Sequence, residues 1–155
     1  MNLVCYEHDE GFVLERFRGR SPSVLVVGAG GGQEVFEALA FGAGRVVGAE
    51  VNPILVRMGL GALAAVNGDL FRHPRVELHA AEARAFLRAG RERFSAIIAR
   101  HTISNAALAA GGLGLSENYL LTREALRDML DHLEEDGVIL MTRPEAQLPR
   151  LVATA

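Results

Sequence analysis

The chain has 155 residues, half of them hydrophobic, which is the size of one globular domain with a covered core. Sixteen basic and nineteen acidic residues give a formal net charge of −3, so the basic excess that nucleic-acid binding requires is missing and we expect no nucleic-acid partner. No apolar run approaches the ~20 residues of a membrane helix, so we expect no membrane segment in this chain.

The single cysteine, Cys5, cannot form an internal disulfide, which favours a cytoplasmic location. The five histidines are scattered, and no metal site is predicted.

Residues 1–22 are interpreted as an N-terminal extension or a short hairpin, and residues 23–155 as one domain. The segment SVLVVG from Ser23 is almost continuously apolar, as in a strand that helices cover on both faces. A helix is predicted from Gln33 to about Phe41, where GAG ends it, and RVVGAE from Arg45 is the second strand.

The next helix is predicted from Pro53, with Asn52 as its N-cap, to about Asn67. The third strand is VELHA at 76–80, followed by a short helix that begins at Glu82 and closes at Gly90. FSAIIAR at 94–100 is the fourth strand. About twenty residues rich in Ala, Gly and Ser follow, and we expect a lid or substrate wall there.

Thr122 is predicted to cap a helix over REALRDMLDHLEED, and GVILMT from Gly137 is the fifth strand. Strands that alternate with helices predict an α/β, three-layer sandwich with a Rossmann-like, mostly parallel sheet. We expect the strand order 3-2-1-4-5, with the sheet truncated after its fifth strand. The sequence leaves open whether a homo-oligomer or a further domain covers that edge.

A glycine-rich turn joins the first predicted strand to the first helix. Gly28, Gly30 and Gly32 remove side chains where the backbone turns, so a ligand can approach main-chain N–H groups beside a helix N-terminus. Glu50 ends the next strand about twenty residues on, where a carboxylate can accept hydrogen bonds from ribose hydroxyls. Together they predict a nucleoside site. In the alternative interpretation the glycines only permit close packing and Glu50 is a solvated charge.

The sixth position of the turn separates two classes of ligand. A dinucleotide fingerprint that starts at Gly28 needs Gly or Ala where this chain has Gln33. The pattern G-x-G-x-G at 28, 30 and 32 is complete, and it resembles the loop of the class I S-adenosylmethionine-dependent transferases. We therefore expect S-adenosylmethionine, or its decarboxylated form, as the cofactor.

Three stretches carry a closer resemblance. They are VLVVGAGGGQEVFEALAFGAGRVVGAEVNP, HPRVELHAAEARAFL and SENYLLTREALRDMLDHLEEDGVILMTR. The chain resembles the catalytic core of the spermidine synthase (polyamine aminopropyltransferase) family, a branch of the class I methyltransferase fold, over most of residues 22–145. It is similar above all to the spermidine synthase-like domains that bacteria attach to membrane segments.

The resemblance implies roles for particular residues. The turn would surround the amino-acid end of the ligand, with Gln33 near its carboxylate, and Glu50 would bind the ribose. Glu82 would hold the amino group of the adenine. The full set of cofactor-binding positions it implies is Gly28, Ala29, Gly30, Gly32, Gln33, Glu50, Val51, Glu82, Ala83 and Arg100.

The chain departs from the family after the fourth strand. The family has a D-x-x-D pattern there, because the attacking amine of its acceptor must be held as a cation and deprotonated by a carboxylate. This chain has ARHTISN instead, and the basic pair Arg100 and His101 suits an anionic or neutral small-molecule acceptor better. His101 is the candidate general base; equally, it is a histidine at a strand end with no part in catalysis.

Two functions follow from the sequence. The first is a transferase that moves a methyl or aminopropyl group from the adenosyl sulfonium to a small acceptor. The alternative is a non-catalytic nucleoside-binding or assembly module that keeps the fold and has lost the aspartates.

Overall fold

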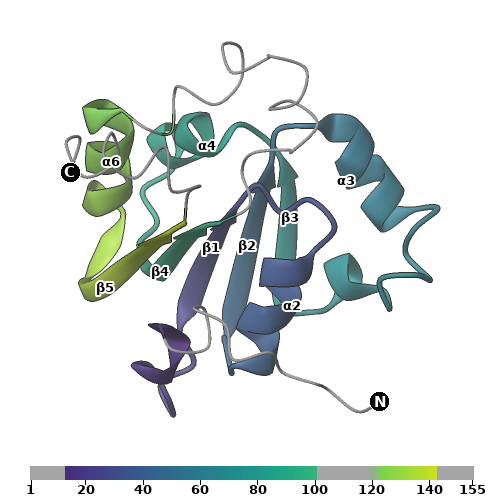
Figure 1. Cartoon of the computed structure of the whole chain (residues 1–155), viewed down its shortest axis with the longest axis horizontal. Coiled ribbons are helices and arrows are strands. Elements are labelled where there is room, and N and C mark those ends of the chain that lie inside the picture. The colour runs from purple at the N-terminus through teal and green to yellow at the C-terminus, as the bar shows by residue number, and fades with distance from the viewer. Residues whose placement is uncertain (1–12, 101–119, 121, 143–155) are drawn as a thin grey trace.

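The computed structural model describes residues 13–100, 120 and 122–142. Its centre is a five-stranded sheet in the order β3-β2-β1-β4-β5, and every neighbouring pair of strands is parallel (Figure 1). The strands are β1 (Ser23–Val27), β2 (Arg45–Glu50), β3 (Val76–Ala80), β4 (Phe94–Ala99) and β5 (Leu133–Met141). The predicted α/β class and strand order are confirmed.

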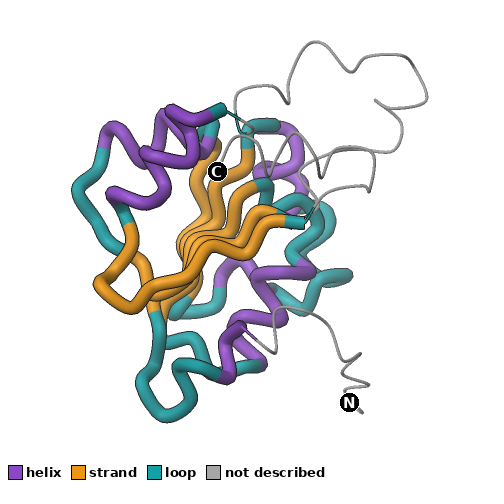
Figure 2. The backbone as a smooth tube through the Cα atoms, turned by 60° about the vertical axis from the view of Figure 1, so that its left-hand side comes forward, coloured by secondary structure: helices purple, strands orange, loops and turns teal. Residues whose placement is uncertain are grey.

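Helices cover both faces of this sheet, as Figure 2 shows. One face carries α2 (Gln33–Ala40), α3 (Pro53–Leu60) and the short 3-10 helix η1 (Leu70–Arg72), and the other carries α4 (Ala83–Ala89) and α6 (Arg123–Asp131). Three helices begin at side-chain caps, on Asn52, Glu82 and Thr122, whose oxygens accept backbone N–H groups of the first turn. Two of these caps, Asn52 and Thr122, are those that the sequence predicts.

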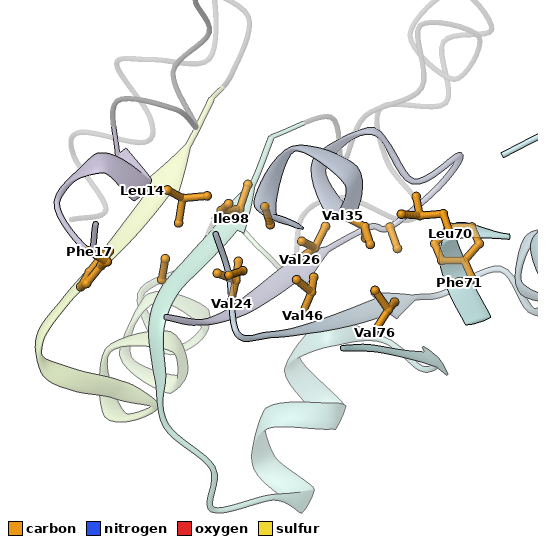
Figure 3. Packing of buried hydrophobic residues seen from close by; sticks show 14 residues of the cluster. Leu14, Phe17, Val24, Val26, Val35, Val46, Leu70, Phe71, Val76 and Ile98 are labelled. Atoms are coloured by element: carbon orange, nitrogen blue, oxygen red, sulfur yellow. The ribbon is translucent and has the colours of Figure 1, made fainter. Parts of the chain in front are cut away.

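The core is divided between the two faces of the sheet. Val24, Val26 and Val46 point to the α2 side, while alternate residues of the same strands pack against α4 and α6 (Figure 3). Leu14 and Phe17, each 1% exposed, belong to the α2-side cluster. The described part of the predicted N-terminal extension therefore contributes to the core, while residues 1–12 lie outside the described range.

The helix predicted from Pro53 to Asn67 is shorter than expected. It ends at Leu60 with Gly61 as its C-cap, and a series of turns follows as far as Asp69. Glycines at 59 and 61 weaken the helix, and the side-chain amide of Asn67 donates to the carbonyl of Gly59 at 3.2 Å, which stabilises the turns instead. The shorter helix matters because residues 65–68, which lie in these turns after α3, form one wall of the candidate site.

The boundary between α6 and β5 is also corrected. The helix was predicted to run through Asp136 but ends at Asp131, and β5 begins at Leu133. Leu133 pairs with Phe94, whereas the next regular pair is Val138 with Ala96, so the polar residues between them form a bulge. Leu133 is 8% exposed, and its burial against the α6-side core fixes the strand start earlier than the helical pattern suggests.

Candidate functional site

The glycine turn lies at the carboxyl end of the central strand β1. Gly28, Gly30 and Gly32 all have positive φ angles, of 76°, 48° and 97°. The N–H of Gly28 donates to the carbonyl of Ala49 at 2.8 Å, which fastens the turn to the end of β2. This edge is where ligands bind in open parallel sheets, at the point where strand order reverses.

Gly32 is required for two physical reasons. Its φ of 97° is one that side-chain-bearing residues rarely adopt, and a Cβ atom built there would lie 2.6 Å from Cδ2 of Leu70. Gly31, in contrast, would place a Cβ where no atom of residues 13–100, 120 or 122–142 lies within 4 Å. The turn is thus packed on one side and open on the other.

Glu50 is the acid that sequence spacing predicts, and the structure brings it to the turn. Its Oε2 accepts the N–H of Gly30 at 2.9 Å, and its Oε1 accepts the N–H of Asn52 at 2.8 Å. The residue is only 6% exposed, and each carboxylate oxygen retains a second acceptor position. Glu50 therefore holds the turn in place and also leaves acceptor capacity for hydroxyl donors.

A cavity of about 800 Å³ lies beside the turn. Five of the predicted residues line it, namely Gly28, Ala29, Gly30, Gly32 and Gln33. Its opposite wall is the segment 65–68 that follows α3, together with Leu70, and Phe36 of α2 is a further apolar lining residue. The size is in the usual range for small-molecule sites.

The remaining predicted residues are placed near the same edge of the sheet but are not among those that line this cavity. Val51 follows Glu50 and is 63% exposed. Glu82 follows β3, where its two carboxylate oxygens accept the N–H groups of Arg84 and Ala85 at 3.0 and 2.7 Å, and Ala83 is buried against the sheet. Glu82 is thus the N-cap of α4, a role that the sequence did not assign to it.

Arg100 comes directly after β4 and its side chain turns toward α2. Its Nη1 lies 3.5 Å from Oε2 of Glu37, and these two side chains are 11% and 18% exposed. Oε1 of the same carboxylate accepts the side-chain N–H of Gln33 at 3.1 Å. The guanidinium charge of Arg100 is therefore paired with an acid on α2.

The predicted catalytic residue His101, and the lid predicted after it, fall outside the described residues except for Leu120. Within the described ranges, no three His, Cys, Asp or Glu residues are grouped closely enough to hold a metal ion. Over those same residues, no helix has both the length and the hydropathy to cross a membrane.

Sequence reasoning missed four features of this site. Gly31 is a variable position of the motif and carries no prediction, although it is the glycine of the turn at which an added Cβ would meet no described atom. Glu37 is four residues after Gln33 on one helix, so the i,i+4 spacing of a Gln and a Glu was an available signal. Phe36 and the wall at 65–68 had no signal, because only the shortened α3 makes that segment a wall.

The fold is similar to that of many solved structures. A spermidine synthase in complex with the transition-state analogue AdoDATO is 22% identical with a TM-score of 0.62, over 89% of this chain and 43% of that one. Spermidine synthase from Thermotoga maritima is 22% identical with a TM-score of 0.66, over 91% and 48% of the two chains. Human methyltransferase-like protein 13 in complex with SAH is 18% identical with a TM-score of 0.62, over 93% and 67%.

At these low identities, the TM-scores show a shared fold. The chain spans less than half the length of the two spermidine synthases. No protein-family model and no curated protein matches the sequence.

Proposed function

We propose that the chain is the cofactor-binding domain of an S-adenosylmethionine-dependent transferase. The observation that carries this proposal is the bond between Gly30 and Glu50, which joins a glycine turn to an acid at the end of the neighbouring strand. A nucleoside needs both features at once, because the turn admits the ligand close to the backbone and the acid accepts from ribose hydroxyls. The likeness to methyltransferases and spermidine synthases supports the same ligand class.

The residues present fit an adenosyl sulfonium better than a dinucleotide. A pyrophosphate would be held at the start of α2, where the chain places Glu34, a 5% exposed acid in the first helical turn. A buried carboxylate there opposes a second anion. An adenosyl sulfonium carries no phosphate, so no pyrophosphate has to be placed beside Glu34.

In the proposed reaction the bound cofactor supplies a carbon activated by its sulfonium leaving group. The protein then has to hold the nucleoside and align that carbon with the acceptor. The turn at 28–32 would fix the amino-acid end, and Glu50 would fix the ribose. We extend the proposal to a small-molecule acceptor and to transfer of a methyl or aminopropyl group, as in the spermidine synthase-like interpretation of the sequence.

Calorimetry with S-adenosylmethionine, its decarboxylated form and methylthioadenosine tests the proposal directly. The sharpest variant is Gly31→Ala, because its Cβ would meet no atom of the described residues and its φ is not positive, so the described fold should be unaffected. A ligand seated against the turn would meet the added methyl group. We expect the variant to bind at least about tenfold more weakly, which is ~1.4 kcal/mol.

The matched control is Gly42→Ala, a second glycine whose added Cβ would have no atom of the described part of the chain within 4 Å, located where α2 ends. Gly42 has a positive φ, so some loss of stability is expected there with no loss of affinity. Failure of all three compounds to bind the folded wild-type protein contradicts the proposal. Equal binding by the wild type and Gly31→Ala places the ligand elsewhere.

A further inference from the structure

The carboxylate of Glu37 determines the orientation of the Gln33 side-chain amide. Gln33 is exposed at the start of α2 and lines the cavity beside the glycine turn. Its Nε2 lies 3.1 Å from Oε1 of Glu37. An ionised carboxylate only accepts hydrogen bonds, so the amide must present its NH₂ group to Glu37, and its carbonyl oxygen lies at the other end of the planar amide.

Glu37 is in turn held by Arg100. The ion pair has an N–O distance of 3.5 Å, and both side chains are less than one fifth exposed, so the carboxylate is fixed between the end of β4 and α2. A partly buried ion pair restrains both partners more firmly than an exposed one. The orientation of the Gln33 amide is therefore set by a pair that extends to the end of another strand.

The charged side chains near Gln33 favour a cationic group, as the amide oxygen does. Glu34 and Glu37 are three residues apart on α2 and so share a side of the helix, and Arg100 contributes one positive charge there. Two negative charges and one positive charge sum to −1. The N-terminus of α2 offsets about half a unit of this, so these three described side chains and the helix end together stay slightly negative.

We propose that Gln33 recognises the ammonium group of the ligand, with its carbonyl oxygen as the acceptor and with Glu37 and Arg100 as positioning residues. This inference rests on the proposed function and names the part of the cofactor that the residue binds. It also reverses the expectation from the sequence that Gln33 lies near a ligand carboxylate. The site would thus favour adenosyl thioethers and sulfonium compounds that carry an amine on the alkyl arm.

A matched series of thioether nucleosides isolates the ammonium. The aminopropyl derivative of 5′-thioadenosine carries only the amine, the carboxypropyl derivative carries only the acid, and methylthioadenosine carries neither. S-adenosylhomocysteine carries both groups. None has the sulfonium charge, and the aminopropyl and carboxypropyl compounds share the same propyl chain, so the difference in calorimetric affinity between these two reports the ammonium and carboxylate groups, while the methyl compound reports the nucleoside alone. We expect the aminopropyl compound to bind about tenfold tighter than methylthioadenosine, and the carboxypropyl compound to bind no tighter.

The key variant is Gln33→Met, which keeps the length of the side chain and removes the amide. We expect the affinity ratio of aminopropyl to methyl compound to fall to within about twofold, while methylthioadenosine itself binds as before. Glu37→Gln should lower the ratio in part, because a glutamine partner no longer dictates which end of the amide faces it. Glu77→Gln, an exposed acid on β3, is the control that leaves the ratio unchanged.

Two results overturn the inference while the proposed function stands. One is a Gln33→Met protein that keeps the tenfold ratio, and the other is a carboxypropyl compound that binds tighter than the aminopropyl compound. Thermal unfolding shows that each variant is folded. If no compound of the series binds the wild type, the proposed function fails, and this inference fails with it.

Discussion

The backbone N–H of Gly30 donates to Oε2 of Glu50 at 2.9 Å, across twenty residues of sequence and between two neighbouring strands. The second oxygen of the same carboxylate accepts the N–H of Asn52. One buried side chain therefore holds both the turn after β1 and the start of the segment that leads into α3. Any change at this residue acts on the fold and on the proposed ligand together, and a test must separate the two effects.

Glu50→Gln is expected to weaken nucleoside binding by about 10- to 100-fold, because a hydrogen bond to a charged group is worth ~1.5–3 kcal/mol. The same change should cost about 1–3 kcal/mol of stability, since an amide has one acceptor oxygen for two buried N–H donors. Affinity is measured by calorimetry with methylthioadenosine. The free energy of unfolding is measured by urea titration.

Glu77→Gln provides the comparison for this substitution. It removes the same charge from an exposed acid at the partner strand β3, with no contact to the turn. We expect methylthioadenosine to bind this control as it binds the wild type. If Glu50→Gln destabilises the protein but leaves affinity intact, Glu50 supports the turn and does not bind the ribose.

Gly32→Ala is expected to destabilise the protein strongly. The added Cβ would lie 2.6 Å from Leu70 and 3.0 Å from Phe71, and the residue would keep a φ of 97°. Overpacking of a filled core and the unfavourable φ each cost on the order of 1–3 kcal/mol. Gly31→Ala is the comparison one residue away and should unfold at the wild-type temperature. Equal melting temperatures for the two variants would show that the turn packs against η1 less tightly than these distances indicate.

Glu82 has two candidate roles, as the N-cap of α4 and as the acid that holds the adenine amino group. Glu82→Ala should cost about 1 kcal/mol through loss of the cap, and should also weaken methylthioadenosine binding. Thr122→Ala removes the cap of α6, where Oγ1 accepts the N–H of Ala125 at 3.1 Å, and should lower stability by a similar amount without lowering affinity. If both variants bind equally well, Glu82 is a cap alone.

The sequence predicts the fold and the glycine–acid pair because each depends on local patterns. The apolar runs at 23–27 and 94–99 indicate buried parallel strands, and the spacing from Gly30 to Glu50 reflects one β-α-β unit. The end of α3 could not be predicted, since the glycines at 59 and 61 only lower helix propensity and the bond from Asn67 decides the outcome.

The partner of Arg100 could not be predicted either. The acid that faces it, Glu37, is 63 residues earlier in the chain, and only the packing of α2 on the sheet brings the two together. From the sequence, Arg100 and His101 form a basic pair that suits an anionic or neutral acceptor. In the fold the charge of Arg100 is paired with the carboxylate of Glu37.

Arg45 gives a prediction for the pH dependence of stability. It donates to Glu77 at 2.7 and 2.9 Å, and this bond lowers the pKa of Glu77 below its ordinary value of 4.5. A lowered pKa in the folded state adds stability above the unfolded pKa, and that stability is lost as pH falls below about 4.5. Because Glu77 is half exposed, we expect less than about 1 kcal/mol from this pair.

Arg45→Met removes the ion pairs with Glu77 and with Glu92, so it should lower the free energy of urea unfolding at pH 7, and the difference from the wild type should shrink toward pH 3. Arg18→Met, which removes the exposed partner of Glu15, should change little at either pH because solvent screens that pair. A difference for Arg45→Met that is the same at pH 7 and pH 3 would mean that the variant loses side-chain packing, since only the ion pair depends on the ionised carboxylate.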